Sequence, residues 1–224
     1  NSLCDLFNKD IYLVKYSVSH YLISRGFETL CNKDARQAKL INASDSDIAS
    51  IFLTNKNIKS VVTWNPLVLE IKSQEPTVSN LFNSSQIPYE ILDILFLRTE
   101  TVNKHPELVK ALQGAWYETL NVMSQDNEQG KMAIHYMAEK AGTTDELFRE
   151  QLKTTYLWKN EQEAKEFTDS KKLKDVMQKI IDFSYDFGLL DQNGQTNNYF
   201  GTQFPDGSVI GNKDNMKIRF TNQF

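Results

Sequence analysis

Residues 60–66 have the sequence Ser60-Val-Val-Thr-Trp-Asn-Pro66, an apolar run that stops at a hydroxyl, an indole and an amide. A second stretch, Ser17-Val-Ser-His-Tyr21, follows the apolar run at 11–16 in the same way. In an open α/β sheet, ligands bind beyond the carboxyl ends of the strands, where the next helix presents free backbone N–H groups. The two stretches therefore predict a small-molecule site at one edge of a parallel sheet.

Strand and helix patterns alternate in the first part of the chain. We expect strands at 11–16, 39–42 and 58–64, and helices at 18–30, 48–54 and 67–73. This alternation predicts right-handed βαβ units and a parallel sheet. Two further apolar runs, at 77–82 and 91–99, predict a short strand and a long one.

The pattern becomes helical from residue 105. We expect helices at 105–124, 132–141, 144–155, 161–167 and 173–189. The tail, 191–224, is predicted to be loop with a hairpin around Pro205-Asp-Gly207. An α/β part followed by a helical part predicts two lobes with a crossover near 89–99.

Composition narrows the possible functions. The 224 residues carry a net charge of −4 and a pI of about 5.5, which argues against a nucleic-acid-binding protein. The first residues contain neither an initiator Met nor a leader pattern, so we expect a removed leader or a fragment. For Cys4 and Cys31 we favour two unpaired thiols, with pairing in an oxidising compartment as the alternative.

Six short motifs occur together, in this order, in a known group of proteins. They are Ser17-Val-Ser-His-Tyr-Leu22, Val62-Thr-Trp-Asn-Pro66, Ser84-Ser-Gln-Ile-Pro88, Gly114-Ala-Trp-Tyr-Glu118, Gln151-Leu-Lys-Thr-Thr155 and Asn215-Met-Lys-Ile-Arg-Phe220. The chain thereby resembles the substrate-binding proteins of ABC transporters in the nitrate/sulfonate/taurine-like group, particularly the branch assigned to urea transport and linked to urea carboxylase. The resemblance covers essentially the whole chain. It implies an α/β, periplasmic-binding-protein-like bilobal fold (type II), in which hinge closure traps a ligand between two lobes.

The resemblance also implies how the chain divides. Residues 10–90 correspond to one complete α/β lobe, the inserted second lobe. Residues 91–224 correspond to the helix-rich C-terminal part of the first lobe, and 1–9 to a remnant of the first crossover. Members of the group begin with a further half-lobe, which we expect to be missing here because the match starts near Asp10. At the return crossover Tyr89 stands where the group commonly has Gly, and we expect this to stiffen or re-aim the hinge.

The later strand-end motif supplies three candidate ligand-binding residues. Asn65 is the strongest, because its amide both donates and accepts hydrogen bonds. Trp64 offers a flat apolar wall with one N–H donor, and Thr63 precedes them in the same motif.

The earlier motif supplies four further candidates, which are Ser17, Ser19, His20 and Tyr21. The two serines fit helix capping and ligand contact equally well, because one hydroxyl can cap while neighbouring N–H groups face a ligand. For His20 no carboxylate lies nearby in sequence, which favours a structural hydrogen bond. Thr155, with Gln151, is a candidate by analogy with the group alone. The cluster Ser44-Asp-Ser-Asp47 is interpreted as a helix cap.

No catalytic motif accompanies these residues. The chain has no G-x-S-x-G, P-loop or H-E-x-x-H sequence, and its three histidines are far apart. We predict a non-enzymatic, periplasmic or otherwise extracytoplasmic solute-binding subunit of an ABC importer, with no cofactor and no metal. Its partners would be a permease, an ATPase and a small polar solute such as urea, nitrate, a sulfonate or taurine. Neither strand-end motif contains Arg, which favours a neutral amide or a small anion held by helix N-termini.

Two other classes of function stay open. One is an enzyme on the same fold, such as a pyrimidine-precursor synthase, and the other is a truncated paralogue that acts as an interaction protein. Without the further half-lobe, the helix 105–124 would lose part of the sheet under its apolar stripe. We therefore expect the chain to self-associate or to need a separate N-terminal segment. The stripe consists of Leu108, Leu112, Ala115, Leu120 and Met123.

Overall fold

The computed structural model describes residues 2–190, 196 and 198–222 and divides into two compact units. Unit 1 comprises Asn1–Leu92 and Val176–Tyr199, and unit 2 comprises Asp93–Asp175 and Phe200–Phe224. The predicted division at 90/91 lies close to the first of these boundaries. It differs in the placement of 176–199, which belong to unit 1.

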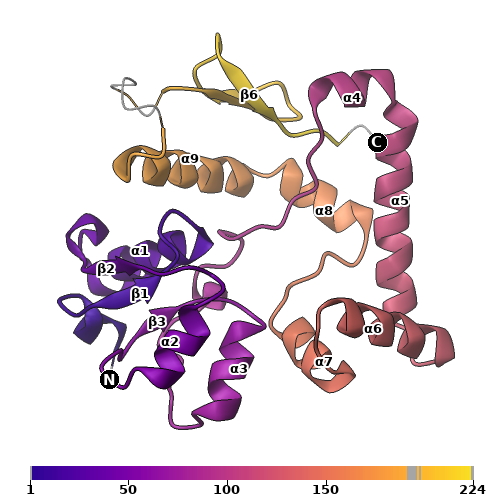
Figure 1. The fold of residues 1–224 in the computed structure, drawn as a ribbon. Helices are drawn as coiled ribbons and strands as arrows, with labels where there is room; N and C mark the ends of the chain where they lie inside the picture. Colours follow the sequence, from indigo (N-terminus) through magenta and orange to yellow (C-terminus); the bar gives the residue numbers. More distant parts are fainter. Residues whose placement is uncertain (1, 191–195, 197, 223–224) are drawn as a thin grey trace. The chain divides into compact units, whose positions relative to one another are not determined.

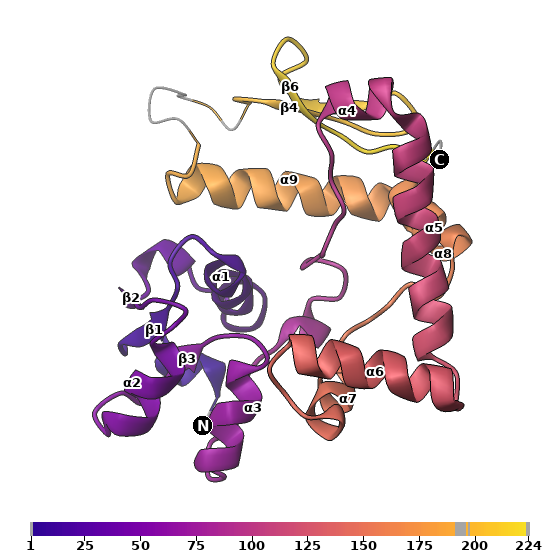
Figure 2. The same cartoon turned by 45° about the vertical axis from the view of Figure 1, so that its right-hand side comes forward.

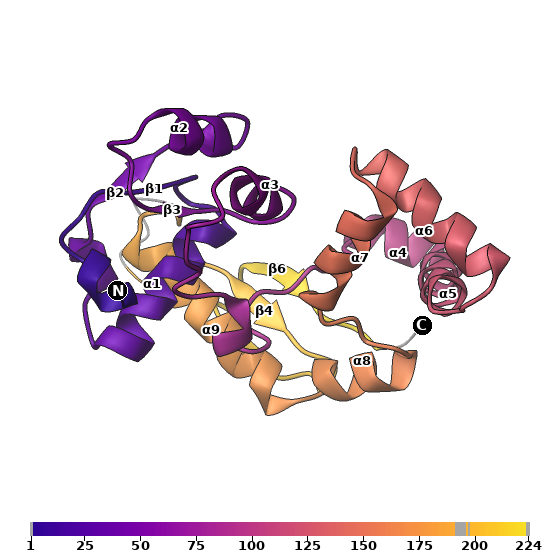
Figure 3. The same cartoon turned by 90° about the horizontal axis from the view of Figure 1, so that it is seen from below.

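Unit 1 is built on a three-stranded parallel sheet in the order β2-β1-β3. Its strands are β1 (Ile11–Leu13), β2 (Leu40–Asn42) and β3 (Val61–Val62). The central strand β1 pairs with both neighbours, and its Ile11 and Leu13 are fully buried in the core that α1 and η1 complete. Helix α1 (Val18–Cys31) lies on one face and α2 (Ile48–Thr54) on the other, which confirms the predicted βαβ units (Figures 1 and 3).

The remaining elements of unit 1 are short. They are helix α3 (Leu67–Gln74) and the 3₁₀ turns η1 (Leu3–Leu6), η2 (Ala35–Gln37) and η3 (Ser84–Gln86). Helix α3 packs against α2. Asn32 ends α1 in a left-handed conformation, with a φ of 50°.

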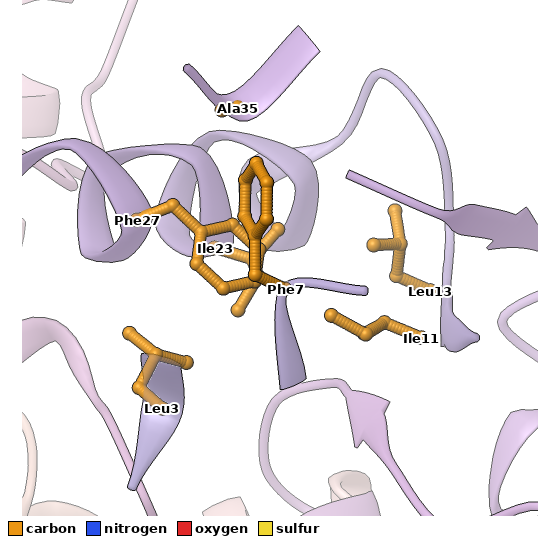
Figure 4. Close-up of a cluster of buried hydrophobic side chains, with 7 residues drawn as sticks. All are labelled: Leu3, Phe7, Ile11, Leu13, Ile23, Phe27 and Ala35. Atoms are coloured by element: carbon orange, nitrogen blue, oxygen red, sulfur yellow. The ribbon is translucent and has the colours of Figure 1, made fainter. Parts of the chain in front are cut away.

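The core of unit 1 packs α1 against β1 and η1 (Figure 4). Its buried members are Leu3, Phe7, Ile11, Leu13, Ile23, Phe27 and Ala35. Phe7 and Phe27 meet edge to face with their ring centroids 5.1 Å apart. Gly26 lies within α1, and a Cβ there would stand only 2.7 Å from a methyl group of Leu3. The absence of a side chain at Gly26 thus allows the close approach of η1.

Cys4 and Cys31 form a disulfide, with their Cα atoms 5.4 Å apart. The expectation of two unpaired thiols is therefore wrong. The sequence could not reveal the pairing, because the contact depends on η1 folding back onto the end of α1. The bond joins two elements that also share the hydrophobic core.

Helix α9 (Lys171–Asp186) contains the boundary at which the chain returns from unit 2 to unit 1. The other helices of unit 2 are α4 (Thr99–Lys104), α5 (Pro106–Met123), α6 (Glu128–Lys140), α7 (Asp145–Lys153) and α8 (Glu161–Thr168). Helix α5 stands between α4 and α6 (Figure 2). Asn127, Thr144 and Asn160 cap α6, α7 and α8, because each side chain accepts a backbone N–H of its helix. None of the described helices has the length and apolar character needed to cross a membrane.

A second sheet lies in unit 2, with the order β5-β4-β6. Strands β4 (Gly201–Gln203) and β5 (Val209–Gly211) are antiparallel, which confirms the predicted hairpin. The prediction of loop for the rest of the tail is wrong at β6 (Met216–Arg219), because these residues form a strand that pairs parallel to β4. The part of that prediction covering 191–195 and 197 lies outside the described residues.

The strands predicted at 77–82 and 91–99 do not form. Within the described residues, neither stretch pairs with another strand. Phe82 instead adds its side chain to the core of unit 1. Residues 92–98 have no regular secondary structure, and α4 starts at Thr99. Both stretches have an apolar sequence suited to a strand, but a strand also requires a partner for its backbone groups.

Candidate functional site

The carboxyl ends of all three strands of unit 1 meet at one edge of its sheet, because the strands are parallel. Strand β1 is central, so the segment that follows it lies between the segments that follow β2 and β3. The two sequence motifs at 17–21 and 63–65 are consequently brought to the same edge. We predict that the first amides of α1 lie within about 10 Å of the Trp64 ring, a pocket-sized gap.

Ser17 acts as the N-cap of α1. Its Oγ accepts the N–H of Ser19 at 3.1 Å and donates to the carbonyl of Val14 at 2.7 Å. The hydroxyl is therefore used by the loop itself, while Ser19 is buried. Among the described residues the Val18 N–H finds no protein partner, so the first turn of α1 still offers a donor at this edge.

The loop between β1 and α1 is held in a defined shape. The backbone N–H of Lys15 donates to Oδ1 of Asn42 at the end of β2, at 2.9 Å. Tyr16 adopts a positive φ of 66°, which is rare for an aromatic residue, and its ring is 56% exposed. An exposed aromatic ring therefore stands next to the N-terminus of α1.

His20 lies inside unit 1 and not at its surface. Only 2% of the residue is exposed, and its Nδ1 accepts the N–H of Tyr16 at 3.2 Å. Its ring packs against Phe183 and Phe187 of α9 and the segment after it, at centroid distances of 5.1 and 4.3 Å. Burial, and to a lesser degree the charge of Lys15, lowers the pKa of His20 to about 4. A neutral, enclosed imidazole fits the structural role that the sequence favoured.

Tyr21 is also buried, and its hydroxyl donates to Oε2 of Glu90 at 2.9 Å. Burial first, and then the charge of Glu90, raises the pKa of Tyr21. Sequence analysis missed Glu90, which is 69 residues away and carries no motif of its own. Tyr21 thus connects the strand-end motif to the interior of the unit.

The motif after β3 contributes a hydroxyl and an aromatic ring. Oγ1 of Thr63 is shielded from solvent and has no hydrogen-bond partner within the described part of the chain. Trp64 is 36% exposed, and its carbonyl accepts the N–H of Val68 in α3. The peptide bond between Asn65 and Pro66 is cis. A hydroxyl without a protein partner beside an accessible indole is the combination expected of a ligand-facing edge.

Two further predicted features, Thr155 and the cluster at residues 44–47, form hydrogen bonds with residues close to them in sequence. Thr155 belongs to unit 2, where its hydroxyl donates to the carbonyl of Gln151 at 3.2 Å, and its ligand contact stays a prediction. The cluster at residues 44–47 satisfies itself, since Ser44 donates to Asp47 at 2.5 Å and Ser46 donates to the same carboxylate at 3.0 Å. The interpretation as a side-chain cap of α2 is therefore wrong, because Asp47 stands at the N-cap position but its side chain makes no capping hydrogen bond to the helix.

The chemistry of the edge is that of holding a molecule. It offers one hydroxyl, backbone N–H donors and two aromatic rings, those of Tyr16 and Trp64. In the part of the chain that the structure describes, no group of three His, Cys, Asp or Glu side chains is arranged to hold a metal ion. The imidazole of His20 uses Nδ1 for the Tyr16 N–H and faces phenyl rings.

Comparison with solved structures gives matches over most of the chain. The periplasmic aliphatic sulphonate binding protein SsuA from Escherichia coli superposes with a TM-score of 0.64 at 14% identity, over 85% of this chain and 61% of that one. The alkanesulfonate-binding protein SsuA from Xanthomonas axonopodis pv. citri, bound to MOPS, gives 0.62 at 15% identity, over 86% and 62%. The chain has the fold of these periplasmic binding proteins. It spans about three fifths of their length.

Sequence comparison adds no relative. No protein-family model matches the chain, and no curated protein matches it. The fold class predicted from the six motifs, a mixed α/β fold like that of periplasmic binding proteins, is confirmed by the structural matches. Both matched proteins are binding proteins by name.

Proposed function

We propose that this chain is the solute-binding subunit of an ABC importer and holds a small polar solute at the carboxyl edge of the unit 1 sheet. The observation that carries this proposal is the Thr63 hydroxyl, which has no partner among the described residues and lies beside the accessible ring of Trp64. The fold shared with two sulfonate-binding proteins supports a binding role. The permease and the ATPase are the partners that such a subunit requires.

The solute is a neutral amide such as urea, or a small molecule with an anionic group, such as nitrate, taurine or an alkanesulfonate. Support comes from the donors at this edge, which are the Val18 N–H at the positive end of α1 and the Thr63 hydroxyl. Lys15 is the cation nearest in sequence to this helix end. No Arg belongs to either strand-end motif, so bidentate capture is not part of the proposal.

An extracytoplasmic location belongs to the same proposal. The Cys4–Cys31 disulfide supports it, because structural disulfides persist in oxidising compartments such as the periplasm.

Isothermal titration with urea, nitrate, taurine and MOPS tests the binding role. We expect one of these to bind, and Trp64→Ala or Asn65→Ala to weaken it by about 1–3 kcal/mol, the cost of a lost aromatic wall or polar partner. Trp116→Ala is the matched control, because Trp116 is an exposed indole on α5 in unit 2. Binding that is unaffected by Trp64→Ala and Asn65→Ala would place the site elsewhere.

Thr63→Val sharpens this test. The valine keeps the shape of the side chain and removes only the hydroxyl that lacks a partner. We expect the solute affinity to fall while the free energy of unfolding stays constant or rises, because no protein hydrogen bond is lost. A loss of stability without a loss of affinity would contradict the assignment of this hydroxyl to the site.

A second candidate function, an interaction protein, is favoured by one specific observation. Ile94, Leu95 and Phe96 are 55, 62 and 82% exposed in unit 2, and Leu108, Leu112 and Trp116 are exposed along α5. Large exposed apolar patches are rare on soluble monomers and mark interaction sites. We propose that a second copy or a separate segment covers it. Sedimentation should show self-association that Phe96→Ser weakens. A monomer that binds no dye for exposed apolar surface would exclude this function.

A further inference from the structure

Glu90 is a buried carboxylate near the point at which the chain first leaves unit 1. It is 7% exposed and stands in the irregular segment that ends unit 1 at Leu92. A carboxylate removed from water is unfavourable unless hydrogen bonds and opposite charges compensate it. The identity of its partners therefore shows what the fold uses it for.

Three side chains from two helices surround this carboxylate. Arg25 of α1 donates from Nε at 2.7 Å and from Nη2 at 3.3 Å, and the Tyr21 hydroxyl of the same helix donates at 2.9 Å. Lys179 of α9 donates from Nζ at 2.5 Å. Burial by itself raises the pKa of Glu90, but these hydrogen bonds outweigh it and lower the pKa to about 2.

The charges within this cluster balance. Glu28, which is more exposed, pairs with Nη1 of Arg25 at 2.5 Å, so two carboxylates face one guanidinium and one ammonium group. Because protein donors already reach both oxygens of Glu90, the cluster is not a vacant ligand site. Its role is structural, because it links α1, α9 and the segment that contains Glu90.

Two members of the cluster, Glu90 and Lys179, come from the two segments through which the chain passes between the units. Glu90 lies just before Asp93, where unit 2 begins, and Lys179 lies one turn of α9 after Val176, where unit 1 resumes. Helix α9 is also held to α1 by aromatic contacts, because Phe183 packs on Tyr21 at 5.3 Å and on His20 at 5.1 Å. Both segments that connect the units, which we call the chain passages, thus contact α1, and the carboxylate of Glu90 links them to each other.

We propose that Glu90 is a shared anchor that couples both chain passages between the units to helix α1. When the first turns of α1 are displaced, the segment 87–92 and the first residues of α9 in unit 1 are then displaced at the same time. The link to solute binding rests on the proposed function, since the N-terminus of α1 belongs to the candidate site. The coupling itself does not depend on any ligand.

Hydrogen–deuterium exchange of the full chain without added solute tests the coupling. Lys179→Met removes a contact on α9, and we expect several-fold faster exchange of the Ile87 and Glu90 amides, which donate to Ser84 and Ile87. Tyr21→Phe should accelerate exchange both in 87–92 and in the first turns of α9 after Val176. Glu28→Gln is the control, because it changes a carboxylate on the same Arg25 and should leave both segments as they are. Acceleration confined to the helix that carries the substitution would overturn the proposal.

A double-mutant cycle separates a shared anchor from two independent contacts. Tyr21 and Lys179 both donate to Glu90, so their effects on exchange in 87–92 should be strongly non-additive in Tyr21→Phe/Lys179→Met. Additive effects would show that no common anchor exists. If titration finds no solute but the cycle is non-additive, the proposed function fails and the anchor stands.

Discussion

Strand β1 of unit 1 and residues 93–97 of unit 2 have similar apolar sequences and opposite fates. Ile11 and Leu13 of β1 are fully buried between two parallel strands. Ile94 and Phe96 are 55 and 82% exposed, and their segment pairs with no strand in the part of the chain that the structure describes. The comparison teaches that an apolar run becomes a strand only where neighbouring strands receive its backbone groups.

The two units also differ in how their cores are closed. In unit 1 the chain folds back on itself twice, once through the disulfide and once through α9, and both closures meet on α1. In unit 2 the long helix α5 buries Val109 and Leu120 but leaves Leu108 and Leu112 exposed. The apolar stripe predicted on this helix is thus covered at only part of its length.

Substitution of matched isoleucines tests the comparison with the largest expected effect. Ile11→Ala should reduce the free energy of unfolding by about 2–5 kcal/mol, because it leaves a cavity in a closed core. Ile94→Ala should change it by less than about 0.5 kcal/mol, because the side chain is half in water. Urea denaturation measures both. Equal effects would mean that residues 93–97 are buried in solution, by a second copy or another segment.

Removal of the disulfide should have the next largest effect. Cys4→Ser/Cys31→Ser should destabilise unit 1 by about 2–4 kcal/mol, because the bond closes a loop of sequence separation 27 and restricts the unfolded chain. Hydrogen exchange should accelerate in α1 and remain constant in β4 of unit 2. Acceleration of both would show that the two units unfold as one body.

Acid should weaken unit 1 through His20. The folded-state pKa of about 4 lies below the ordinary 6.5, so the unfolded chain binds a proton first as the pH falls. Stability is therefore lost between pH 6.5 and 4, by up to about 3 kcal/mol. His20→Asn, whose amide oxygen can still accept the Tyr16 N–H, should remove this part of the slope. Thermal unfolding of both proteins across that range measures the difference, and parallel curves would contradict it.

Tyr89 should give the smallest effect. Its φ of 67° is left-handed, a conformation that Gly adopts without strain, and it precedes the anchor residue Glu90. Tyr89→Gly should be about 1 kcal/mol more stable than Tyr89→Ala, because both lack the ring and only alanine keeps the backbone strain. Denaturant titration of the pair provides the value. An alanine variant as stable as the glycine variant would show that the conformation is not strained.

Local signals made part of this structure predictable. The periodicity around β1 and α1, the hydroxyl of Ser17 as a cap and the turn at Pro205–Gly207 each depend on residues that are close in sequence. The fold class followed because such elements alternate. At the candidate site, the structure shows Ser17 in one of the two roles that its motif allowed, that of a helix cap.

The rest depends on contacts between distant residues. The burial of His20 requires Phe183 and Phe187, and the role of Tyr21 requires Glu90, all of which lie far away in the chain. The pairing of β6 with β4 and the Cys4–Cys31 bond are likewise set by tertiary folding. Backbone partners, which side-chain patterns do not encode, decided that 77–82 and 91–99 are not strands.

The disulfide has a topological consequence for the candidate site. Cys4 and Cys31 enclose all of β1 and α1, so the whole stretch from Ser17 to Tyr21 lies inside a covalent ring. A protease that cuts within this ring opens it without releasing either end, and the two pieces stay joined until a reductant is added. Residues 17–21 of the candidate site therefore stay covalently linked to η1, which contributes to the core, even after a single cut within the ring.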